Sequence, residues 1–146
     1  MLTEHLTYKD SGPPQWGEAL YRYCTFDALD DEGLNFTGIM QASTFTRCSF
    51  YWGLFNCALL DGVRFVDCTF PGTSFRGVRF MECTFENCRF VLDNLGGDCT
   101  IEGSILAACV FDGCVWVTRP EGKRDITNSQ FLGCTFRNCR GFEGLG

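Results

Sequence analysis

The sequence predicts a repeat protein with one continuous apolar interior, in which two of every five side chains point inward. A Phe or Leu stands at every fifth position without interruption from Phe45 to Phe90. The residue two places before each of these centres is nearly always small, and the remaining positions are mostly polar or Gly. A helix would need apolar residues three and four apart, and a strand would need them two apart, so neither simple period fits.

Length and charge narrow the class of protein. The chain has 146 residues, enough for one domain with its own core. Acidic residues outnumber basic ones by 18 to 12, which favours solubility and argues against direct binding of nucleic acid. No apolar run approaches the roughly 20 residues needed to cross a bilayer, and the first residues lack the order of a signal peptide. We therefore expect a cytoplasmic protein without a membrane segment.

The cysteines follow the repeat. Of the 11 Cys, all but Cys57 lie two residues before a repeat centre or before Gly141, which occupies a centre's place. A disulfide scaffold is typical of secreted chains, and zinc sites usually pair cysteines two to four residues apart rather than five. We interpret the thiols as small packing groups and expect no metal and no cofactor.

The repeat frame changes at two places and has a gap near its end. Upstream of residue 45, Phe26 and Phe36 fit a frame in which one residue is lost near residues 39–40. One residue is gained at Gly96 and Gly97, after which the centres are Ile101, Leu106, Phe111 and Trp116. Residues 117–128 are either a degenerate part of the repeat with Ile126 inside, or a loop.

The pattern divides the chain into three segments. Residues 1–18 show no repeat, and we favour a cap on the first coil over an arm that contacts a partner. The repeat occupies residues 19–141. In the tail, residues 142–146, Phe142 or Leu145 can plug the last coil.

The repeat resembles the pentapeptide-repeat proteins, in the variant where Cys precedes and Phe occupies the centre. The resemblance covers roughly residues 19–140, and it implies an all-β fold, a right-handed quadrilateral parallel β-helix. Each pentapeptide then makes one side, and about twenty residues make one coil, which gives about six coils. Four acidic or amide side chains depart from the pattern: Asp31, Gln41 and Glu121 at centres, and Asp93 at an inward position.

Residues one coil apart should stack inside such a tube. We expect Phe45, Phe65 and Phe85 to form one column, and Phe50, Phe70 and Phe90 to form another that continues into Phe111 and Phe131. Burying each ring is worth roughly 2 to 3 kcal/mol. The predicted core comprises Phe45, Phe50, Phe55, Phe65, Phe70, Phe75, Phe80, Phe85, Phe90, Phe111, Phe131 and Phe136.

The sequence offers no catalytic constellation. The only His, His5, lies outside the repeat, and no nucleophile elbow, phosphate loop or metalloprotease motif occurs. We therefore expect a protein that is not an enzyme and that acts through its outer surface.

Two features of the outer surface indicate a protein partner. Tyr51, Trp52, Val91 and Leu92 should align as an apolar stripe of the kind that marks an interface. Acidic residues should form two rows that steer association, one with Asp27, Asp67 and Glu86 and the other with Asp61, Glu82 and Glu102. Isolated exposed apolar residues and a merely solvated charged surface remain the alternatives.

The favoured function is a small inhibitor, such as an immunity protein that blocks a toxin or a nucleic-acid-processing enzyme. The family resemblance also implies a DNA-mimicking protector of a type II topoisomerase (gyrase), and a structural scaffold is a third hypothesis. A monomer is favoured over an oligomer.

Overall fold

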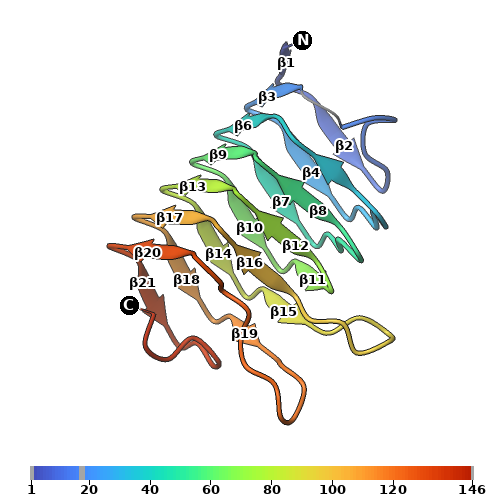
Figure 1. Cartoon of the computed structure of the whole chain (residues 1–146). Helices are drawn as coiled ribbons and strands as arrows, with labels where there is room; N and C mark the ends of the chain where they lie inside the picture. The colour runs from blue at the N-terminus through green and yellow to red at the C-terminus, as the bar shows by residue number, and fades with distance from the viewer. Residues whose placement is uncertain (1, 17–18, 146) are drawn as a thin grey trace.

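The computed structural model describes residues 2–16 and 19–145. The chain winds into a right-handed, four-sided β-helix whose walls are sheets of parallel strands (Figure 1). The described residues include no helix, and therefore none that could cross a membrane.

The four sheets form four walls, which we call A, B, C and D. Along the chain, each coil passes through wall A, then B, then D, then C. Wall A contains β1 (Leu2–Glu4), β3 (Leu20–Arg22), β6 (Ile39–Gln41), β9 (Leu59–Asp61), β13 (Arg79–Met81), β17 (Ile105–Ala107) and β20 (Gln130–Leu132). Wall B contains β2 (Thr7–Lys9), β4 (Thr25–Asp27), β7 (Thr44–Thr46), β10 (Arg64–Val66), β14 (Thr84–Glu86), β18 (Val110–Asp112) and β21 (Thr135–Arg137). Wall C contains β5 (Asn35–Phe36), β8 (Leu54–Asn56), β12 (Ser74–Arg76) and β16 (Thr100–Glu102). Wall D contains β11 (Thr69–Pro71), β15 (Arg89–Val91) and β19 (Val115–Trp116).

The middle residue of each strand points into the tube, and these residues stack in columns. On wall B, the ring of Phe65 lies 5.0 Å from Phe45 and 5.0 Å from Phe85, with near-parallel planes. All the Phe residues expected in the core are buried except Phe131 and Phe136, which are half-buried because they belong to the last coil. The spacing of five is thus the length of one wall plus its corner.

The expected continuation of the second column is wrong. Phe90 stacks on Trp116 at 5.2 Å, whereas Phe111 stacks on Phe85 at 4.6 Å and extends the wall B column. Phe131 pairs with Leu106 on wall A. The reason is a longer coil, since Phe75 pairs with Ile101, 26 positions on (101 − 75), instead of 20 as between Phe55 and Phe75 (75 − 55).

The residue lost near positions 39–40 shortens one corner. Met40 is the buried residue of β6, and Gln41, expected at a centre, faces outward. Gly38 precedes this strand, and a Cβ there would collide with the backbone oxygen of Ala19 on the preceding coil. A side chain at this corner is therefore excluded by the close approach of the neighbouring coil.

The N-terminal segment, expected outside the repeat, contributes strands to two walls. β1 pairs in parallel with β3, and β2 pairs with β4, so the ring of Tyr8 stacks 5.3 Å from Phe26. Further along, the buried indole of Trp16 packs on Tyr21 and Phe26 and donates a 2.6 Å hydrogen bond to Asp31. Asp31 therefore meets a polar partner where the repeat would have an apolar residue.

The C-terminal tail covers the open end of the last coil. Phe142 is buried and packs against Phe111, Trp116 and Phe136 with ring separations of 5.3 to 5.7 Å. Leu145 also packs against this cluster.

The inward cysteines are free thiols, and most of them hydrogen-bond to the coil before them. The Sγ atoms of Cys68, Cys88 and Cys114 donate to the carbonyl oxygens of Phe45, Phe65 and Phe85 at 3.4, 3.3 and 3.2 Å. Burial raises the pKa of the fully enclosed Cys99 thiol above its ordinary value. These small thiols act as packing groups between coils.

Candidate functional site

The predicted apolar stripe lies at the corner where wall D turns into wall C. The register pairs Pro71 with Val91, and the amide of Trp52 donates to the carbonyl oxygen of Pro71 at 3.0 Å. Tyr51, Pro71 and Val91 therefore occupy one outward row, and Trp52 begins the next row, which ends at Leu92. The structure brings the four predicted residues to one corner.

Residues 92–98, the first corner loop, project from this corner between β15 and β16 (Figure 1). Asp93, expected to point inward, instead organises the loop. Its Oδ1 accepts hydrogen bonds from the amides of Leu95 and Gly97, both at 2.8 Å. Its Oδ2 accepts one from the Trp52 indole at 2.7 Å. The Gly97 amide first, and the Trp52 indole next, hold the pKa of Asp93 below its ordinary value.

The polar atoms of Tyr51 and Trp52 thus hydrogen-bond to the first corner loop. The hydroxyl of Tyr51 accepts a 2.9 Å hydrogen bond from the amide of Asn94, and the rings of Tyr51 and Trp52 lie 4.9 Å apart. Trp52 adopts a φ of 55°, a left-handed conformation that is strained for a bulky residue. The hydrogen bond to Asp93 helps to hold it there.

Gly72 makes the contact between Trp52 and Asp93 possible. It lies one coil after Trp52, in the row that ends at Leu92, and has a φ of +59°. A Cβ at this position would lie 2.8 Å from both the Cβ and the Oδ2 of Asp93. Without a side chain at Gly72, the indole crosses over one coil to reach the loop.

The most exposed apolar side chain of this corner is Leu95, which sequence reasoning missed. Leu95 is 85% exposed, compared with 47% for Trp52. The only signal was the spacing from Phe90 to Ile101, which is not a multiple of five and could have indicated an inserted loop rather than a one-residue shift. An ordered loop that presents Leu95 next to the exposed Trp52 offers a protein partner an apolar contact, and Trp is a residue type enriched among interface anchors.

Residues 117–124, the second corner loop, project from the same corner one coil later (Figure 1). A guanidinium nitrogen of Arg119 lies 3.2 Å from Oδ2 of Asp98 and so connects the two loops. Glu121, expected at a centre, is exposed in the loop, where residues 119–122 line a hollow of about 440 Å³. Wall C resumes at Asp125, which bridges to Thr100, and Ile126 packs against the core.

The acidic residues of the first predicted row do not form a continuous negative strip. Asp27 pairs with Arg47 at 2.6 Å, and Glu86 pairs with Arg64 at 2.9 Å. Asp67 is exposed in the turn after β10. Two of the three carboxylates of this row are therefore paired with Arg.

The second predicted row is wrong in its membership. Asp61 ends β9 and Glu82 follows β13, so both lie at the end of wall A. Glu102 instead ends β16 on wall C, 3.7 Å from Arg76. The first corner loop lengthens the coil and moves Glu102 to another wall.

Chemically active groups are sparse elsewhere. Among residues 2–16 and 19–145, no group of three or more His, Cys, Asp and Glu is placed to hold a metal ion. What the described surface offers is an ordered, partly apolar protrusion suited to contact with another macromolecule.

Comparisons with known proteins agree with the architecture. The family model for Pentapeptide repeats matches residues 58–91 in eight copies. No curated protein sequence matches the chain. Among solved structures, two trypsin-treated variants of QnrB1, a plasmid-mediated fluoroquinolone resistance protein, are similar with TM-scores of 0.58 and 0.56. They are 15% and 12% identical, and the matches cover 95% and 91% of this chain and 72% and 90% of those chains. Likeness at this identity concerns the fold alone.

Proposed function

We propose, because the chain belongs to the pentapeptide-repeat proteins, that it is a non-catalytic protein-binding module that inhibits an enzyme. The favoured role is that of an immunity-type protein, which blocks a toxin or a nucleic-acid-processing enzyme. The observation that supports this most is the protruding pair of corner loops, with Leu95 exposed on the first loop and Trp52 exposed beside it. Enzyme sites are concave clefts lined largely by apolar groups, and a convex, ordered loop is complementary to such a cleft.

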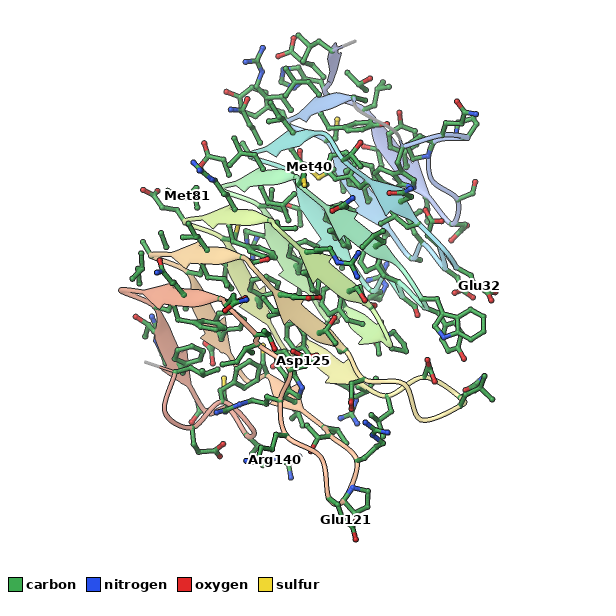
Figure 2. All side chains as sticks on the ribbon, viewed as in Figure 1. Glu32, Met40, Met81, Glu121, Asp125 and Arg140 are labelled. Carbon is green, nitrogen blue, oxygen red and sulfur yellow. The ribbon has the colours of Figure 1, made fainter. Side chains whose placement is uncertain are left out.

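The net negative charge of the chain favours a basic partner, although the second corner loop itself carries Arg119 and Lys123 beside Glu121. Glu32 lies next to the row that continues through Tyr51. It is exposed on one side of the pair of corner loops, and Glu121 is exposed on the other side (Figure 2). The chain as a whole carries a formal charge of −6. Clefts that hold nucleic acid are lined by Lys and Arg, so acidic side chains around an apolar anchor would speed association with them.

Co-purification tests this proposal. We expect the protein to co-elute with the toxin enzyme encoded by the neighbouring gene and to suppress its activity. Trp52→Ala and Leu95→Ser should each weaken capture at least tenfold, about 1.4 kcal/mol or more, as expected of interface anchors. Tyr23→Ala and Leu6→Ser, which alter exposed side chains at the A–B corner, are matched controls and should leave capture unchanged. Independent elution in low salt would exclude this partner.

Protection of a type II topoisomerase is the second candidate, because QnrB1, which shares the fold, is a fluoroquinolone resistance protein. A version based on DNA mimicry would need unneutralised acidic rows, and the Arg partners of Asp27, Glu86 and Glu102 weigh against it. In a supercoiling assay with a fluoroquinolone present, a protector should restore topoisomerase activity. Loss of this effect on replacing Asp67 and Glu86 by Lys, with Leu95→Ser still active, would favour charge mimicry over the corner loops.

A further inference from the structure

Wall A carries an apolar outer surface that the proposed function does not use. Its outward residues on β6, β9, β13 and β17 include Ile39, Leu59, Met81, Ile105 and Ala107, which we call the aliphatic strip. Ile39 and Met81 are 39% and 38% exposed, and Figure 2 shows Met81 pointing away from the tube while Met40 lies inside it. The corresponding positions of wall B are largely Thr and charged residues. Strand residues that face water usually alternate with the core as polar residues, so this strip indicates a contact surface.

Two charges stand within the aliphatic strip and have no partner of their own. Arg79 lies beside Leu59 in one row, and Asp61 lies beside Met81 in the other. Neither makes an ion pair within the part of the chain that the structure describes. On wall B, by contrast, Arg64 reaches Glu86 across the coils at 2.9 Å. The strip therefore presents one positive and one negative group, each available to an outside group.

We propose that wall A is an interface through which two copies of this chain pair side by side. A flat apolar surface that carries one charge of each sign is complementary to itself under a two-fold axis. With that axis parallel to the long axis of the β-helix, each strand faces the same strand of the second copy, running in the opposite direction. The row of Leu59 and Arg79 then faces the row of Asp61 and Met81.

In this arrangement Arg79 meets the Asp61 carboxylate of the second copy, and symmetry makes the contact twice. The two residues are offset by one strand spacing, about 4.8 Å, across a sheet separation of about 10 Å. An extended Arg side chain reaches that far towards a carboxylate. Packed sheets at this separation also bury Ile39, Leu59, Ile105 and Met81 between them.

The size of the wall predicts a weak and reversible pair. Seven strands at about 4.8 Å and about 10 Å of strand width give roughly 340 Å² of flat wall on each copy. Stable complexes bury about 800 Å² on each partner, so this pairing is concentration-dependent rather than permanent. Wall A lies opposite wall D in the four-sided tube, so both corner-loop sites stay free in the pair.

Sedimentation velocity from about 10 µM to about 1 mM tests the proposal, a range chosen for weak association. The wild-type mass should rise with concentration from 16.4 kDa towards twice that value. Arg79→Asp and Asp61→Arg should each remain monomeric, because like charges then face each other. Arg89→Asp, an equivalent change on wall D, should associate as the wild type does.

Mixing the two single variants gives the decisive measurement. One variant then carries only carboxylates at the two positions and the other only guanidinium groups, so the mixture should form mixed pairs that neither variant forms alone. Far-UV circular dichroism confirms that each variant is folded. A wild type that stays monomeric throughout, single variants that associate normally, or a mixture that fails to pair would each overturn the proposal. None of these results bears on capture of a partner by the corner loops.

Discussion

Phe85→Ala should be among the most destabilising single changes in this protein. Phe85 is 1% exposed and lies mid-column, with stacked rings at 5.0 Å (Phe65) and 4.6 Å (Phe111). Losing its burial costs roughly 2 to 3 kcal/mol. The two stacked partners add about 0.5 to 1.5 kcal/mol each. The total of about 3 to 6 kcal/mol is a large part of the 5 to 15 kcal/mol that usually stabilises a domain.

Urea denaturation followed by far-UV circular dichroism measures this cost. Phe136→Ala serves as the comparison, because Phe136 is half-buried in the last coil and has one stacked partner, Phe111 at 5.0 Å. We expect it to lose about 2 kcal/mol. Thr84→Ala, beside Phe85 but on the outer surface, should change stability by less than about 0.5 kcal/mol. If Phe85→Ala costs no more than Phe136→Ala, the argument that column depth sets stability is refuted.

Three further predictions concern the corner and the thiols. Gly72→Ala should displace Asp93 and cost about 1 to 2 kcal/mol because of its positive φ, and the indole N–H resonance of Trp52 should shift in NMR spectra while the fold persists. Because the folded pKa of Asp93 is depressed, the loop hydrogen bonds should be intact at neutral pH and should be lost only as pH falls through this folded pKa, below the ordinary carboxyl value. Amide exchange at Leu95 should then accelerate, and Asp93→Asn should remove this pH dependence. Cys57, the one exposed thiol among the described cysteines, should react rapidly with a thiol reagent in the native state, and Cys57→Ser should eliminate the fast phase.

The wall architecture could be predicted because Phe recurs every five residues and its ring points into the tube each time. Phe45 through Phe90 place the corners, and the burial of these rings requires the tube. The predicted positions were wrong where the length of a corner loop, rather than the type of residue, decides which wall the chain reaches next. A one-residue shift and an inserted loop leave the same frame downstream, so the positions of Leu95, Asp93 and Glu102 could not be deduced from the repeat.

The N-terminal strands escaped prediction for a different reason. β1 places Thr3 opposite Tyr21, and β2 places Tyr8 opposite Phe26, so two inner positions five residues apart lack the Phe that marks the repeat elsewhere. Backbone pairing to the next coil, rather than side-chain identity, holds these strands in the walls. The aliphatic strip was missed because apolar residues beside a centre are indistinguishable from core residues until the register is known.

The parallel stacking of coils has a consequence for how the molecule comes apart. Every coil touches only the coil before and the coil after it, so unfolding should behave as a one-dimensional chain of neighbours that frays from its termini. Amides of β10 and β14 should then exchange with deuterium only on complete unfolding, and those of β1 and β20 much earlier. A graded protection profile along the sequence would distinguish this protein from a globular domain of equal size, which opens as one unit.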